Sequence, residues 1–179
     1  MQIQITNLDP SAERYKLVMY ACTYFAKILL PKISCDPSYK VEIIFMNKLE
    51  KLTYAETRWK DSAHKPKYCT IEIKKFKNTL TLIKTLAHEF THVKQIFHNE
   101  LIDIVSSDTD YLWKRKRYNI VTSDYWLLPW EIEANGYEVA LIEKFRNKYD
   151  ITLNELQTNS TRVVEKIEHE IVDSLPKVV

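Results

Sequence analysis

Glycine is almost absent from this chain, which contains a single one, Gly136, among 179 residues. Tight turns with positive backbone φ use glycine more readily than any other residue. Its scarcity therefore disfavours an all-β fold built on many tight turns and favours long helices. Because 45% of the residues are apolar and the length is that of an ordinary domain, we expect residues 1–179 to form a single domain around one core.

Other features that are scarce or missing exclude several classes of protein. The longest apolar run is far too short to span a bilayer, so we expect no membrane association. The N-terminal segment MQIQITNLDP is polar and alternating, which is not typical of a signal peptide. The net charge of +2 is nearly balanced, so composition alone implies no polyanionic partner.

Cysteine is scarce as well. The three cysteines are odd in number and lack C-x-x-C spacing, which predicts reduced intracellular thiols and no metal site built on them. They are Cys22, Cys35 and Cys69. We therefore expect a cytoplasmic protein. The Lys-, Ile-, Asn- and Tyr-rich composition fits a phage or an AT-rich genome, and a phage protein would lie in the cytoplasm of the host cell.

Hydrophobic patterns along the chain predict an α+β fold, with a small mixed sheet packed on a central helix and further helices at the N- and C-termini. Strands are predicted at residues 2–8, 41–46, 53–59 and 70–75. Helices are predicted at about 11–30, at 80–99, from Pro129 onward, and after the capping box Thr152-x-x-Glu155. The apolar stripe of the last helix consists of Val163, Val164, Ile167, Ile171 and Leu175. His64, in a polar turn at 61–67, is expected at the surface.

The segment at residues 80–99, LTLIKTLAHEFTHVKQIFHN, contains the candidate catalytic residues. It contains His88-Glu89-Phe90-Thr91-His92, an H-E-x-x-H motif. Histidines four apart lie one turn apart on a helix face, so both imidazoles can reach one metal ion. The glutamate between them is placed to hold and deprotonate a metal-bound water. We therefore predict His88 and His92 as metal ligands and Glu89 as the general base.

The position of these histidines on the helix distinguishes a metal site from a pair of core histidines. The apolar stripe of the helix consists of Leu82, Ile83, Leu86, Phe90, Val93 and Phe97. Because successive residues are about 100° apart, the two histidines lie about 140° from the centre of that stripe. Core histidines would lie within the stripe, so His88 and His92 are predicted to face a cleft or solvent.

The third ligand decides the type of metal site, and His98 is one candidate. Its spacing from His92 matches the H-E-x-x-H-x-x-x-x-x-H pattern of metzincins. That family has glycine at the position of Gln95, where the chain turns back, and glutamine resists the left-handed conformation of such a turn. The downstream methionine of that family is also missing, because all three methionines precede the motif. We therefore expect His98 at the surface, near a helix end.

The helix that begins at Pro129 offers two better candidates, Glu131 and Glu133. Each lies at an edge of the apolar stripe of this helix, so the helix face does not separate them. Here the chain resembles the gluzincin group of zinc metallopeptidases, whose third ligand comes from E-x-x-x-[D/N] on a later helix, a pattern that Glu131-Ile-Glu-Ala-Asn135 fits. The resemblance implies that Glu131 is the ligand and that Asn135 orients a ligand histidine.

The motifs HEFTHVKQ and PWEIEA also resemble those of small SprT-like and phage-type metallopeptidases, over about residues 68–145. The chain departs from SprT itself, whose third ligand is a histidine, and from thermolysin-like enzymes, whose spacer between the motifs is shorter. The resemblance implies a zincin-like domain that binds one Zn²⁺ per chain and hydrolyses a peptide or protein substrate. It also implies that residues 69–75 form a sheet edge that pairs with the substrate backbone. The substrate-binding residues would be Thr70, Ile71, Glu72 and Ile73.

Residues 111–126 combine aromatic side chains with four consecutive cations, at 114–117. Such a mixture suits phosphates and stacked bases, so the alternative function is a non-catalytic, zinc-stabilised module that binds nucleic acid or protein. A protease that acts on a regulator or on DNA-bound proteins would combine both features, with a weak association with nucleic acid. On a strand, however, the cations split between two faces, which predicts a solvated hairpin whose aromatics pack over the cleft. Tyr118 and Tyr125 are both candidates to stabilise an oxyanion, and the sequence does not choose between them.

Overall fold

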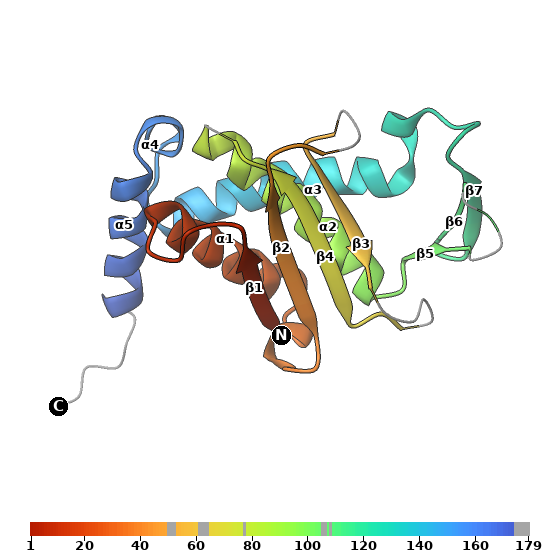
Figure 1. The fold of residues 1–179 in the computed structure, drawn as a ribbon, viewed down its shortest axis with the longest axis horizontal. Coiled ribbons are helices and arrows are strands. Elements are labelled where there is room, and N and C mark those ends of the chain that lie inside the picture. The colour runs from red at the N-terminus through yellow and green to blue at the C-terminus, as the bar shows by residue number, and fades with distance from the viewer. Residues whose placement is uncertain (50–52, 61–64, 77, 105–106, 108, 174–179) are drawn as a thin grey trace.

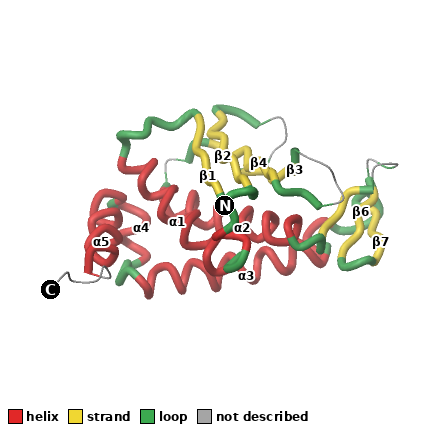
Figure 2. Tube along the Cα trace, turned by 90° about the horizontal axis from the view of Figure 1, so that it is seen from below, coloured by secondary structure: helices red, strands yellow, loops and turns green. Residues whose placement is uncertain are grey.

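A four-stranded mixed sheet with helices packed against it makes up most of the molecule (Figure 1 and Figure 2). The structure, a computed structural model, describes residues 1–49, 53–60, 65–76, 78–104, 107 and 109–173. His64 and Leu175, for which the sequence makes predictions, lie outside the described residues. The predicted α+β class, with a small mixed sheet on the motif helix, is confirmed.

The sheet has the strand order β1-β2-β4-β3. Three strands run parallel, namely β1 (Gln2–Thr6), β2 (Lys40–Met46) and β4 (Tyr68–Lys74). The fourth, β3 (Ala55–Trp59), pairs antiparallel with β4 at one edge. Alternate side chains of β2 and β4 point into the core and are buried, namely Val41, Ile43, Phe45, Cys69, Ile71 and Ile73. Because side chains alternate between the faces of a strand, this pattern fixes which face of the sheet the helices cover.

The position of β4 corrects one prediction. Residues 69–75 are not a sheet edge, because β4 lies between β2 and β3 and pairs with both. The side chains of Thr70, Ile71 and Ile73 are buried, and that of Glu72 is half-buried. Alternation in the sequence shows which side chains share a face, but it does not show which strands are neighbours. The sheet edge beside the motif helix is β3.

The described chain also forms five α-helices and two short 3-10 helices. The α-helices are α1 (Glu13–Leu29), α2 (Thr79–Phe97), α3 (Pro129–Lys148), α4 (Leu153–Thr158) and α5 (Ser160–Asp173). The 3-10 helices are η1 (Ile33–Cys35) and η2 (Tyr125–Leu127). In the described part of the chain, no helix has both the length and the apolar composition that crossing a membrane requires.

The motif helix α2 is held at the centre of the molecule by its cap and its apolar stripe (Figure 1). Asn78 begins the helix, because its side chain accepts a hydrogen bond from the Thr81 N–H at 3.0 Å. The ring of Phe90 on α2 lies 6.4 Å from that of Phe25 on α1, which lies 5.9 Å from that of Phe145 on α3. All three rings are fully buried. This aromatic cluster fixes α3 relative to α2, and so fixes the two helices that carry the motifs.

A small antiparallel sheet lies between α2 and α3 in the sequence. It consists of β5 (Leu101–Asp103), β6 (Asp110–Trp113) and β7 (Lys116–Asn119), in that order. Lys114 and Arg115 form the turn between β6 and β7, with positive φ angles of 47° and 72°. The predicted hairpin is therefore present, and its turn is made without glycine. Left-handed residues elsewhere in the described chain also carry side chains, at Asn7, Asn99 and Asp150.

Aromatic residues of this small sheet pack against the start of α3. The rings of Tyr111, Trp113 and Tyr118 lie 5.8, 6.3 and 5.7 Å from the ring of Trp130. Trp130 is 5% exposed and directly precedes Glu131 in the first turn of α3. Aromatic contacts of this kind contribute about 0.5–1.5 kcal/mol each beyond the area they bury. The small sheet therefore holds the first turn of α3, and with it Glu131.

Candidate metal centre

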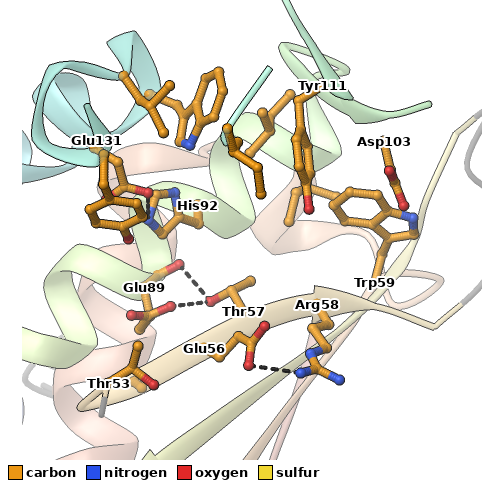
Figure 3. A pocket seen from close by; sticks show the side chains of 17 residues that line it. Thr53, Glu56, Thr57, Arg58, Trp59, Glu89, His92, Asp103, Tyr111 and Glu131 are labelled. Atoms are coloured by element: carbon orange, nitrogen blue, oxygen red, sulfur yellow. Dashed lines mark hydrogen bonds and ion pairs between the residues drawn. The ribbon is translucent and has the colours of Figure 1, made fainter. Parts of the chain in front are cut away.

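Three side chains of the metal-ligand type converge from two helices: His88 and His92 of α2, and Glu131 of α3. The Nε2 atoms of the two histidines lie 3.1 Å apart. Oε2 of Glu131 lies 3.3 Å from Nε2 of His88, and its Oε1 lies 3.5 Å from Nε2 of His92. The structure thus brings together the three ligands that the sequence predicts, and this group could hold a metal ion. Figure 3 shows His92 and Glu131 side by side at one end of a cleft.

The distances within this group fit a tetrahedral ion. A tetrahedral zinc ion with bonds of about 2.0–2.1 Å separates its ligand atoms by about 3.3 Å. The three separations measured here are 3.1, 3.3 and 3.5 Å. Glu131 is only 4% exposed, and its Oε2 is buried without a hydrogen-bond partner among the described residues. Leaving a buried carboxylate oxygen unsatisfied is costly, and a cation at this position would satisfy it.

His92 and Glu131 each favour the charged form of the other. Burial alone would lower the pKa of His92, but Glu131 and Glu89 outweigh it and raise that pKa to about 9. Burial likewise opposes the charge of Glu131, yet the two histidines lower the pKa of its carboxyl to about 2. A metal ion at this position would therefore have to displace a proton from His92, as is usual when a metal binds imidazole.

Gln95 orients His92. Its Oε1 lies 2.8 Å from Nδ1 of His92, and an amide oxygen can only accept a hydrogen bond. In the neutral imidazole, Nδ1 is therefore the protonated nitrogen, and the lone pair of Nε2 faces the other two side chains of the group. The amide of Gln95 donates in turn to the backbone oxygen of Trp130 and to the carboxylate of Glu133, both at 3.0 Å. Glu133, the rival ligand, thus supports Gln95 and does not face the metal site.

Glu138 of α3 lies beside His88. Its Oε2 is 3.8 Å from Nδ1 of His88, and burial raises its pKa, although the charges of His88 and Lys84 oppose this. No side-chain hydrogen bond of Asn135 is found within the described part of the chain, and its role in orienting a ligand histidine stays a prediction. The two nitrogens of an imidazole point in different directions. Glu138 faces Nδ1 of His88, whereas Glu131 faces Nε2, and the two glutamates lie about two turns apart on α3.

The carboxylate of Glu89 lies beside the ligands and is held from β3. The hydroxyl of Thr57 donates a hydrogen bond of 2.6 Å to Oε2 of Glu89 (Figure 3). Glu89 is 5% exposed, yet it lines the cleft. Thr57 is not predicted from the sequence, because only the tertiary fold brings β3 next to α2.

Of the two candidate tyrosines, Tyr125 is the one that lies near the candidate metal ligands. It lines the same cleft, and burial together with the charge of Glu131 raises its pKa. Its phenol is therefore protonated at neutral pH and can donate a hydrogen bond. Tyr118 instead packs edge-on against Trp130, with an angle of 89° between the rings.

The cleft beside the ligands has a volume of about 680 Å³ and is bounded by β3, α2 and the small sheet (Figure 3). Its apolar and aromatic lining includes Trp59, Ile96, Leu101, Tyr111, Leu128 and Trp130. Charged side chains lie both beside the ligands and at the far end of the cleft, where Asp103 is found. A cleft that combines apolar surfaces with placed polar groups can hold a small molecule or a peptide side chain.

Comparison of the chain with protein-family models, with curated proteins and with solved structures finds no match. Fold alone does not define activity, so function is inferred here from the chemistry of the site.

Proposed function

We propose that this protein is a zinc-dependent metallopeptidase. The observation that carries the proposal is the convergence of His88, His92 and Glu131, with Glu89 beside them in a cleft. Catalytic zinc sites commonly use three protein ligands and keep one position open, whereas structural sites are closed by four, usually with cysteine. Among the described residues, no fourth His, Cys, Asp or Glu side chain joins the group. This ligand set supports a catalytic role for the metal.

The proposed reaction is hydrolysis of a peptide bond. Zinc, when bound, lowers the pKa of a coordinated water toward neutrality and polarises the substrate carbonyl. Glu89 takes a proton from the attacking water and delivers it to the leaving amine. Thr57 holds the carboxylate of Glu89 in place through its 2.6 Å hydrogen bond. Tyr125 donates a hydrogen bond to the carbonyl oxygen as negative charge develops on it.

The substrate backbone is proposed to bind along β3. This strand pairs with β4 on one side only, and Thr57 links it to Glu89. An extended peptide can add to such an edge through main-chain hydrogen bonds, with little demand on its sequence. Binding there would bring a peptide carbonyl past Glu89. β3 thus takes the role that the sequence assigns to residues 69–75.

The alternative of a non-catalytic binding module at residues 111–126 has less support. Three of its aromatic side chains pack around Trp130, where they hold α3. Lys114 forms an ion pair with Glu133, and Arg117 forms one with Asp110. A weak association with nucleic acid stays a prediction.

Metal analysis and peptide hydrolysis, measured on wild type and on Glu89→Gln, test the proposal. We expect about one zinc ion per chain in both proteins, because Glu89 is not a ligand. Hydrolysis of a mixed peptide library should occur with wild type and fall by about 10²–10⁴-fold in Glu89→Gln. A wild-type protein that takes up no zinc after incubation with it would overturn the proposal. Full activity in Glu89→Gln would remove this residue from the reaction.

A further inference from the structure

The end of the cleft away from the metal ligands has a carboxylate beside aromatic rings. Asp103 on β5 lies directly opposite Tyr111 on β6, so their side chains share one face of the small sheet. Both residues line the cleft, together with Trp59 at the end of β3 (Figure 3). The same cleft is lined by Glu89 and His92 at its other end.

Asp103 lacks a direct partner for its charge among the described residues. Its carboxylate makes no hydrogen bond and no ion pair within the described part of the chain. Arg58 is the one arginine or lysine among the described residues that line the cleft, and its guanidinium lies 2.8 Å from the carboxylate of Glu56. Burial and, next, the charges of Asp103 and Glu56 raise the pKa of Tyr111, and the charge of Arg58 opposes them. The cross-strand pairing with Asp103 is the geometric reason why its charge acts on this ring. A half-buried carboxylate of this kind would be stabilised by a cation from outside the chain.

The aromatic rings define which cation fits. Trp59 and Tyr111 offer ring surfaces beside the carboxylate, and such surfaces attract cations as well as alkyl chains. The side chains of arginine and lysine combine a long apolar stem with a charged end. The planar guanidinium of arginine also stacks on aromatic rings and can bind a carboxylate with two parallel hydrogen bonds.

We propose that this end of the cleft is a specificity pocket for a basic side chain of the substrate, with arginine preferred, near the scissile bond. Asp103 binds the cation, and Trp59 and Tyr111 contact the stem. The proposal depends on the peptidase function proposed above, and it adds the class of substrate.

The test compares peptides that differ at one position, which holds arginine, methionine or glutamate. Wild type should cleave the arginine peptide with a kcat/KM at least about tenfold above that of the methionine peptide. Asp103→Asn should lower this ratio by about tenfold, and Asp103→Lys should shift the preference toward glutamate. A wild type without preference for arginine, or an unchanged ratio in Asp103→Asn, would overturn the proposal.

A matched control is available in Asp150→Asn. Asp150 lies just after the end of α3, and its side chain is fully exposed, so this change removes the same charge far from the cleft. Its left-handed φ of 50° is one that asparagine tolerates. The ratio of arginine to methionine cleavage should be unchanged in this variant, provided that zinc content and circular dichroism match those of wild type.

Binding of the same peptides to metal-free protein, followed by tryptophan fluorescence, separates the two proposals. One outcome is that no peptide is cleaved, that the arginine peptide binds more tightly than the other two, and that Asp103→Asn removes this difference. That outcome would support the pocket and overturn the peptidase function. If all three peptides are cleaved with the same kcat/KM in wild type and in Asp103→Asn, the result would support the peptidase function and overturn the pocket. Neither cleavage nor a binding preference would overturn both.

Discussion

Gln95 accepts a hydrogen bond from Nδ1 of His92 at 2.8 Å while its amide donates one to the backbone oxygen of Trp130 at 3.0 Å. One fully buried side chain thus joins a ligand on α2 to the residue that precedes Glu131 on α3. The spacing of the two helices and the orientation of the imidazole are therefore set together. A metal bound by both helices would depend on this link.

Replacing Gln95 with methionine should weaken zinc binding. The change keeps the length of the side chain but removes its hydrogen bonds to His92, Trp130 and Glu133. We expect zinc affinity to fall by about 10–100-fold, and the metal-free protein to lose about 1–3 kcal/mol of unfolding free energy. Competition with a chromogenic chelator and urea unfolding measure the two effects. Gln157→Met, at an exposed position on α4, is the matched control, and equal zinc affinities in the two variants would contradict the role of Gln95.

The variants Glu131→Gln and Glu133→Gln should differ in metal content. Each removes one negative charge with little change in shape, and the two positions lie in the first two turns of α3. Glu131→Gln should lose most of its zinc, because the carboxylate that faces both histidines becomes a neutral amide. Glu133→Gln should still contain about one zinc ion per chain, because its carboxylate bonds to Gln95 and lysines. Elemental analysis of the two variants, purified in parallel with wild type, measures their zinc content. Loss of zinc in Glu133→Gln and its retention in Glu131→Gln would assign the ligand to Glu133.

Replacing Thr57 with valine should slow hydrolysis without loss of metal. Valine has nearly the same shape and suits a strand, but it cannot donate the 2.6 Å hydrogen bond to Glu89. A hydrogen bond to a charged group is worth about 1.5–3 kcal/mol, so we expect kcat to fall by about tenfold or more. Thr53→Val, in the lining of the same cleft, serves as the control. Unchanged turnover in Thr57→Val at full zinc content would show that Glu89 does not need this contact.

The stability of the C-terminal helices should depend on pH through Glu155. The backbone N–H of Thr152 and the ammonium group of Lys166 donate to its carboxylate, and they lower its pKa from the ordinary 4.5 to about 2. Because the folded pKa is the lower one, the stabilisation is complete above about pH 4.5 and is lost as the pH falls toward 2. Glu155→Gln should therefore be less stable than wild type at pH 7, with a difference that shrinks across this window. Urea unfolding at a series of pH values measures it, and a constant difference would contradict the prediction.

The spacing of residues within one segment predicted the histidine pair on α2. His88 and His92 converge because residues four apart share a helix face. For the third ligand, spacing left Glu131 and Glu133 open, and only the resemblance of the motif after Pro129 to that of gluzincins pointed to Glu131. Strand order was not predictable in this way, because alternation in the sequence carries no information on neighbouring strands. The contacts of Thr57 and Glu138 were missed for the same reason, since each joins segments that only the tertiary fold brings together. Gln95 has a local signal, three residues after His92 on the same helix, but its second partner lies on α3.

The turn at Lys114 and Arg115 has a consequence for the unfolded chain as well as for the folded one. A left-handed conformation costs a residue with a side chain about 1–2 kcal/mol. A glycine at the same place would avoid that strain, but it would give the denatured ensemble more backbone conformations to lose on folding. The described left-handed positions all carry side chains. Because this turn has no glycine, the denatured chain has less backbone entropy to lose when it folds. The native hairpin carries the backbone strain of two left-handed residues instead.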